Sequence, residues 1–196
     1  MQPLATSFVL GFHGCDRSVA DKLVEGESFN PSRNDYDWLG PGAYFWEANP
    51  QRGIDFAREL QTLRRGPKVE SPAVVGAVID LGLCLDVTTT AGIRQIRDAH
   101  ADLSKVAEAA GQPLPSNSSD SLRRKLDCAV VTYLHQVRGA RNLAAIDTLR
   151  GIFVEGDPVY AGSGFHDKTH VQICVCNPNS IKGVFRVHPR FLDQTE

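Results

Sequence analysis

Apolar runs of strand length alternate with segments of helical periodicity along this 196-residue chain. The run over residues 5–12 is apolar and ends at a glycine, which favours a buried strand over a short helix. Apolar residues then recur at helical spacing between Ser18, which can cap a helix, and Gly26, which can end one. The pattern therefore predicts a strand, a turn that carries His13, and a helix.

The next segment, FNPSRNDYDWLGPG, is rich in Pro, Asn, Asp and Gly, so it predicts a loop, and its length suggests a role beyond connection. AYFW follows as a short aromatic strand. Asn49 and Pro50 then open a helix that we expect to run to about Leu63, with apolar residues on one side. A second strand and a second helix thus follow the loop.

In the second half of the chain, AVVGAVIDLGLCLDVT predicts one buried strand, or two with a bend near Gly82. Residues 91–110 have helical spacing and predict one or two helices, and Cys128 to Arg138 is apolar enough for a core helix. GIFVEG, PVYAG and HVQICVCN predict closing strands. The last of these alternates, with Val171, Ile173 and Val175 on one face and His170, Gln172, Cys174 and Cys176 on the other.

Composition and length narrow the class of protein. A chain of 196 residues fits one domain over residues 1–196, and its hydrophobic and charged fractions, 42% and 22%, match those of globular proteins. The formal net charge of -2 argues against a general nucleic-acid coat protein, although Arg123, Arg124 and Lys125 form either a local basic patch or a solvated helix face.

No apolar stretch reaches the roughly 18 to 20 residues of a membrane helix, and no signal peptide pattern opens the chain. The five cysteines fit reduced thiols. We therefore expect a cytoplasmic protein without a membrane partner.

Three short motifs carry the candidate chemistry: FHG at a strand end, GPGAYFW entering the next strand, and HVQICV on a late strand. Each motif alone is also compatible with core packing, because isolated histidines and aromatic residues are common in protein interiors. Their order and spacing are what point to a shared site.

With these motifs the chain resembles the ADP-ribosyltransferases of the diphtheria toxin and poly(ADP-ribose) polymerase type, which are marked by a His, a Tyr and a Glu on three strands. VLGFHGCDRSVADKLVEGESF is similar to the first block of that family, and LGPGAYFWEANPQRGIDFA is similar to the second. The resemblance covers roughly the first sixty residues, and the last thirty more loosely. It implies an α+β fold in which two mostly antiparallel sheets enclose an NAD cleft.

The resemblance also implies roles for individual residues. His13 would hydrogen-bond the adenosine-side ribose of NAD, and the N–H and C=O of Gly14 would hold the nicotinamide carboxamide. Tyr44 would stack on the nicotinamide ring, with Phe56 as the opposite wall. Cys15 stands where the family usually has Ser or Thr.

The third family position is occupied differently, because the alignment puts Gln172 in place of the glutamate. A glutamine can hydrogen-bond the nicotinamide-side ribose but cannot accept a proton, so it favours single transfer over chain building and leaves room for an inactive pocket. Glu155 either supplies the missing carboxylate or is a surface residue in a glycine-rich turn. Asp37 and Trp38 lie in the loop that would cover the adenosine side of the pocket, and Arg150 either attracts a phosphate or forms an ion pair.

The function implied is mono-ADP-ribosylation: the nicotinamide N-glycosidic bond of NAD, a consumed co-substrate, is cleaved and ADP-ribose passes to a protein or nucleic-acid acceptor, with no metal. NAD glycohydrolase activity and an inactive NAD- or ADP-ribose-binding module are the alternatives. A toxin with an antitoxin or regulatory partner, a phage-defence effector and a housekeeping modifier all remain open.

Two other sites are weighed against this one. A metal site could use His166, His170, Cys174 and Cys176, but residues 170 to 176 of a strand extend over about 20 Å, too far for ligands of one zinc ion. A nucleophilic pair of Cys15 and His13 lacks an evident orienting Asn or Asp.

Overall fold

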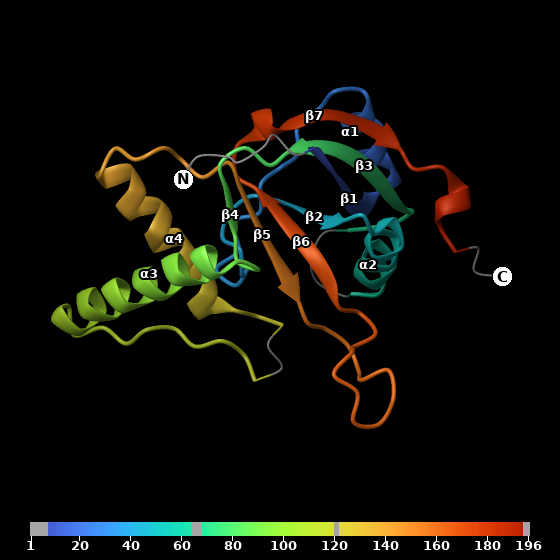
Figure 1. Cartoon of the computed structure of the whole chain (residues 1–196). Coiled ribbons are helices and arrows are strands. Elements are labelled where there is room, and N and C mark those ends of the chain that lie inside the picture. The colour runs from blue at the N-terminus through green and yellow to red at the C-terminus, as the bar shows by residue number, and fades with distance from the viewer. Residues whose placement is uncertain (1–7, 64–67, 120–121, 194–196) are drawn as a thin grey trace.

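The computed structural model describes residues 8–63, 68–119 and 122–193. Within them, the chain forms a mixed sheet with helices on both sides (Figure 1). The α+β class is therefore confirmed. In chain order the elements are β1 (Phe8–Asp16), α1 (Arg17–Val24), β2 (Ala43–Glu47), α2 (Pro50–Thr62), β3 (Pro72–Asp80), β4 (Cys84–Asp86), α3 (Thr90–Ala109), α4 (Lys125–Ala140), β5 (Thr148–Phe153), β6 (His170–Val175) and β7 (Ile181–Arg186).

The seven strands follow the order β4-β5-β6-β2-β1-β3-β7, and all neighbours are antiparallel except β4 and β5. Strand β1 pairs with β3 along its whole length, from Phe8 to Asp16. It pairs with β2 only at Gly11 and Phe12. The hydrogen-bonded strands thus form one sheet rather than the two expected, but its three-stranded and four-stranded parts are joined by only two residue pairs.

On one face of the sheet, side chains of the three-stranded part pack against side chains of the four-stranded part. Phe45, Ile173 and Val175 from the four-stranded part form a cluster with Ala77 and Ile79 from the three-stranded part. Side chains from distant strands meet only if the two parts curve toward each other, so this cluster draws them over a common core.

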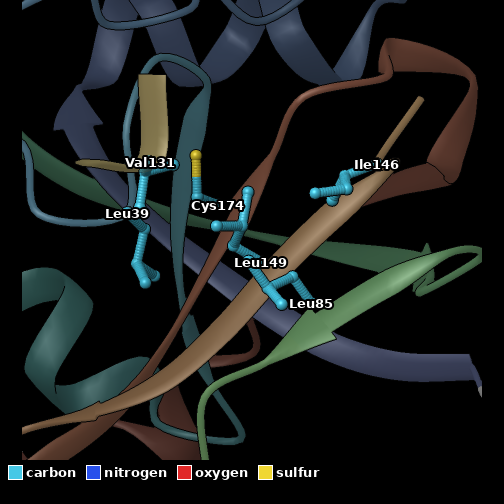
Figure 2. Packing of buried hydrophobic residues seen from close by; sticks show 6 residues of the cluster. All are labelled: Leu39, Leu85, Val131, Ile146, Leu149 and Cys174. Atoms are coloured by element: carbon cyan, nitrogen blue, oxygen red, sulfur yellow. The ribbon is translucent and has the colours of Figure 1, made fainter. Parts of the chain in front are cut away.

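The opposite face of the four-stranded part packs against the loop at Leu39 and the helix α4. Figure 2 shows this cluster, which consists of Leu39, Leu85, Val131, Ile146, Leu149 and Cys174. Leu85 and Leu149 have no exposed surface, and complete burial of such a side chain contributes about 2 kcal/mol. α3 contacts α4, so this helical pair covers the β4 edge of the sheet (Figure 1).

Helix α2 lies on β1 because two glycines let the backbones approach. A Cβ atom added at Gly14 would lie 2.0 Å from the carbonyl oxygen of Gly53. The start of the helix follows the sequence signals, since the Asn49 side chain accepts a hydrogen bond from the Arg52 N–H and Pro50 occupies the first turn. The tight contact places the first turn of α2 over the His13-Gly14 segment.

The segment before α3 forms two strands with a left-handed residue, Gly82 (φ 54°), in the turn between them, as one of the two sequence alternatives predicted. Two other elements differ from the expectations. PVYAG is not a strand but part of an irregular connection over residues 154–169, where Pro158 and His166 form an isolated bridge. Strand β7 was not anticipated, because exposed residues interrupt its apolar pattern.

The helical segment after Thr89 is one helix, α3, and the core helix predicted around residues 128–138 is α4. In the described part of the chain, no helix combines the length and apolar character needed to cross a membrane.

Candidate functional site

The sheet opens between β1 and β2 just beyond their two residue pairs. The Ala48 N–H donates to the Leu10 carbonyl (2.9 Å), and the Arg17 N–H donates to the Ser71 carbonyl (2.8 Å) beside β3. Backbone groups of alternate residues point to the same neighbouring strand. The even-numbered residues of β1 therefore face β2, and the N–H and C=O of Gly14 face the opening, past the last pair at Phe12.

His13 occupies this opening. Its Nδ1 lies 2.9 Å from the carbonyl oxygen of Tyr44 and must donate, because a carbonyl only accepts. The ring meets Phe29 edge-on, with 5.3 Å between ring centroids, and lies 5.7 Å from Phe45. Burial lowers the pKa of His13, and the Tyr44 carbonyl opposes this only in part. The neutral imidazole therefore presents a lone pair at Nε2.

Tyr44 points to the other face of the sheet. Its hydroxyl donates to the Gly40 carbonyl (2.8 Å) and accepts from the Leu39 N–H (3.1 Å), and its ring packs against the cluster of Figure 2. Burial is the main cause that raises the pKa of Tyr44, so the phenol stays protonated. The backbone of Tyr44 reaches His13, but the two side chains do not converge as the sequence led us to expect.

Gln172 shares the face of Tyr44 and lies directly across from Trp46 on β2. Its Oε1 accepts a hydrogen bond of 2.6 Å from the Trp38 indole N–H. Trp38 passes over Gly151, where an added Cβ would lie 2.5 Å from the ring. The loop before β2 and the late strand therefore meet at Gln172.

Asp37 holds that loop in place. Its carboxylate accepts hydrogen bonds from the Ser32 hydroxyl and from Asn34 Nδ2 (3.3 Å). Burial raises the pKa of Asp37, although these two hydrogen bonds oppose the shift. Asp37 thus organises the turn that presents Trp38.

Beside Gln172 lies a group that we call the Arg52 cluster, formed by Trp46, Arg52, Phe56, Glu155 and His170. Arg52 Nη2 donates to both carboxylate oxygens of Glu155, at 3.1 and 3.0 Å. Its Cζ lies 5.6 Å from the centre of the Trp46 ring and 5.9 Å from that of Phe56. The Trp46 and Phe56 rings are 4.9 Å apart and tilted, so they touch and form one aromatic wall.

The Arg52 cluster leaves hydrogen-bonding capacity unused. Among the described side chains, the buried polar atoms without a partner are Trp46 Nε1, Arg52 Nε, Arg52 Nη1 and His170 Nε2. His170 donates from Nδ1 to the Lys168 carbonyl (2.7 Å), and burial lowers its pKa, so Nε2 is an acceptor. Buried polar groups normally have partners, so three unused donors and one acceptor indicate a place for a polar ligand or water.

The sequence reasoning found Phe56 and Glu155 but missed Arg52, Trp46 and His170 as members of this cluster. One signal was present for Arg52: it lies four residues before Phe56 on the predicted helix and so on the same helical face. No pattern in the sequence indicated that Glu155, 103 residues later, would meet it.

The contacts of Cys15 and Arg150, two other residues considered from the sequence, are those of core packing and of an ion pair. Cys15 is buried among Ala20, Leu23 and Ala73, and burial raises its pKa to about 11, so it remains a thiol. This leaves the alternative of a Cys15–His13 nucleophile without an activated sulfur. Arg150 is held by Glu47 (2.5 and 3.1 Å) and Asp86 (3.1 Å), which is the ion-pair alternative.

The residues of the alternative metal site point to separate partners. His166 bonds the Gly156 carbonyl, His170 the Lys168 carbonyl and Cys174 the Gly40 carbonyl. In the segments that the structure describes, no group of three or more His, Cys, Asp or Glu residues is arranged to hold a metal ion.

Comparisons with known proteins give one short match. Over 36 residues the chain is 47% identical to "Uncharacterized protein MJ0359" from Methanocaldococcus jannaschii. The match covers 18% of this chain and 17% of that protein, whose name assigns no function. No family profile and no solved structure matches the chain.

Proposed function

We propose that this protein is an NAD-consuming mono-ADP-ribosyltransferase whose cleft begins at the opening between β1 and β2. The supporting observation is the backbone of Gly14, whose N–H and C=O face the opening beyond the last pair of β1 with β2. A carboxamide carries the complementary acceptor and donor, so the nicotinamide amide of NAD fits this edge. The α2 contact at Gly53 covers one face of Gly14, so the ligand approaches in the plane of the sheet.

His13 binds a ribose hydroxyl from the same opening. The hydrogen bond to Tyr44 fixes its tautomer, and Nε2 then accepts a hydrogen bond from the sugar. In this arrangement Tyr44 positions His13 through its carbonyl and supports the loop through its hydroxyl. The aromatic surface for nicotinamide comes instead from the half-buried Phe56, which packs on the buried Trp46 ring.

Gln172 supplies the amide that orients the nicotinamide-side ribose, since it is the neighbour of Trp46 across the sheet. Trp38 fixes that amide by donating to its oxygen, which leaves the amide N–H groups for the sugar hydroxyls. The acceptor would dock on the connection over residues 154–169, which extends away from the sheet (Figure 1) and exposes Val159, Tyr160 and Phe165.

A binding module without cleavage is the second candidate, and one observation favours it. The one carboxylate assigned a catalytic role, Glu155, is already engaged by Arg52, and Gln172 has no ionisable group. Such a pocket could bind NAD or ADP-ribose without stabilising the cationic transition state.

NAD labelled in its adenylate, incubated with the protein in cell lysate with and without nuclease, tests these functions. The change to Gln172→Ala removes the ribose contact and should lower nicotinamide release about 10²-fold, by analogy with the loss of one electrostatic donor. His13→Asn should lower it at least tenfold. His100→Asn and Gln136→Ala alter exposed residues of α3 and α4 and serve as matched controls.

Label on a macromolecule supports the transferase, and its loss after nuclease treatment names nucleic acid as the acceptor. Free ADP-ribose alone supports glycohydrolase activity, and label bound without nicotinamide release supports the binding module. Cleavage that survives both site variants, or the absence of any NAD binding by calorimetry, would reject the proposed cleft.

A further inference from the structure

A separate groove of about 830 Å³ lies between α4 and the loop before β2. Cys128 and His135 line it from α4, and Cys176 lines it from the end of β6. The proposed NAD cleft uses none of these residues. The groove thus brings two sulfur atoms and an imidazole to one accessible space.

Cys176 and His135 are neighbours in the lining of this groove. The Cys176 sulfur lies 3.9 Å from His135 Nε2 and 3.6 Å from the Pro41 carbonyl. The backbone of Cys176 is fixed because its N–H donates to the Asp147 carbonyl at 2.9 Å, as the Asn177 N–H does at 3.0 Å. Both side chains are partly exposed. The pair is therefore held by rigid elements and remains open to small molecules.

The groups around Cys176 favour its thiolate. Cys174, two residues earlier on the same strand face, is fully buried and keeps its proton because burial raises its pKa. The adjacent Cys174 thiol is the largest influence that lowers the pKa of Cys176, and His135 lowers it further. Burial and the carboxylate of Asp147 oppose the shift.

The rim of the groove indicates which reagents it admits. Arg33 and Lys125 line it, and the Asp35 carboxylate pairs with the Lys125 ammonium at 2.7 Å. Arg33 therefore adds positive charge to the lining of the groove. An anionic reagent is attracted to such a rim more strongly than a neutral reagent is.

We propose that the Cys176–His135 pair is a covalent modification site, at which Cys176 undergoes thiol–disulfide exchange with small anionic disulfides that enter the groove. The thiolate sulfur attacks one sulfur of the disulfide, and a new S–S bond to Cys176 forms as the original S–S bond breaks. The second sulfur leaves as a thiolate with the bonding electron pair and takes a proton from His135 or solvent. Cys176 is thereby oxidised and the small disulfide is reduced.

The fraction of Cys176 that is ionised at a given pH sets the expected rate of its reaction. Because the pKa of Cys176 is lowered, a larger fraction of this thiol is ionised below pH 7 than of an ordinary cysteine, whose pKa is about 8.5. Lower basicity reduces the intrinsic reactivity of each thiolate, but by less than the gain in ionised fraction. Cys176 should therefore react several-fold faster than an ordinary exposed cysteine at pH 6.5.

The test follows the reaction of the whole chain with 5,5′-dithiobis(2-nitrobenzoate), a dianionic disulfide, in stopped-flow experiments from pH 5 to 9. Peptide mass spectrometry of the unaltered protein then identifies the cysteine that is modified first. Cys176→Ser should remove the fast phase, whereas Cys128→Ser and Cys84→Ser, a groove residue and a residue outside it, should retain it. His135→Gln should move the midpoint of the rate profile upward by about one pH unit or more.

A neutral disulfide, 4,4′-dithiodipyridine, separates the charge of the rim from the reactivity of the sulfur. Arg33→Gln should slow the anionic reagent and leave the neutral one unchanged. First modification at a cysteine other than Cys176, or an unchanged pH profile in His135→Gln, would overturn the proposal. The experiment contains no NAD, so its result is independent of the proposed transferase activity.

Discussion

The ion pair between Arg52 and Glu155 joins α2 to the segment after β5, and its loss is the sharpest test of how the Arg52 cluster is held. The side chains of Arg52 and Glu155 are 8% and 18% exposed, so solvent screens them little. We consider Glu155→Gln, which keeps the shape of the side chain and removes its charge.

The distances set the magnitude. At 3.0 Å and an effective dielectric constant of about 20, two unit charges attract each other by roughly 5 kcal/mol before desolvation. Removing one partner of a buried pair typically costs about 3 to 5 kcal/mol. We expect about 3 kcal/mol, because the amide keeps a hydrogen bond and Glu59 still lies 3.4 Å from the same guanidinium nitrogen. For a chain of this length that is a fall in Tm of roughly 6 to 12 °C.

Urea unfolding at equal m values measures the loss, and a double-mutant cycle with Arg52→Met assigns it to the pair. In the Arg52→Met background, Glu155→Gln should cost less than about 1 kcal/mol, because no buried cation is left unpaired. Glu59→Gln is the matched control: it faces the same Arg52, but its side chain is 40% exposed, so we expect less than about 1 kcal/mol. A small loss in Glu155→Gln, or additive losses in the cycle, would refute the burial argument.

Two further changes test residues at the opening of the sheet. Tyr44→Phe removes the hydroxyl that bonds Leu39 and Gly40 and should lower the free energy of unfolding by about 2 kcal/mol. The control Tyr160→Phe changes a residue that is 62% exposed and should lower it by less than about 0.5 kcal/mol. Equal effects of the two changes in urea unfolding would contradict the core role of Tyr44. Gly14→Ala pushes a methyl group against the Gly53 carbonyl and should lower the free energy of unfolding by about 3 kcal/mol. Gly183→Ala is its control, because an added Cβ there meets no atom within 4 Å. A Tm for Gly14→Ala within 1 °C of the unaltered protein would show that α2 does not lie against β1.

Local elements were predictable where short-range signals agreed. The helix after Asn49 begins at the residue that the cap and Pro50 indicate, and the alternation of HVQICV correctly places Ile173 and Gln172 on opposite faces of β6. PVYAG misled because its apolar residues, Val159 and Tyr160, lie exposed on a protruding connection. Apolar character predicts a strand only when burial accompanies it.

The candidate site shows the same limit. The motifs predicted that His13, Tyr44 and Gln172 lie on neighbouring strands, and the pairing of β1 with β2 and of β2 with β6 puts them there. It did not predict that the His13 ring would enter the gap between strands while the Tyr44 ring turned to the opposite face. The direction of a side chain depends on the register, which the motifs do not contain.

The sequence by itself determined most of the local elements and which residues carry polar chemistry. The tertiary structure decided which of them meet: that Arg52 is neutralised by a carboxylate 103 residues away, that Trp38 binds Gln172 across 134 residues, and that Cys176 meets His135. Turns and helix caps depend on neighbours within a few residues, whereas these contacts arise only when strand order and helix packing bring distant segments together.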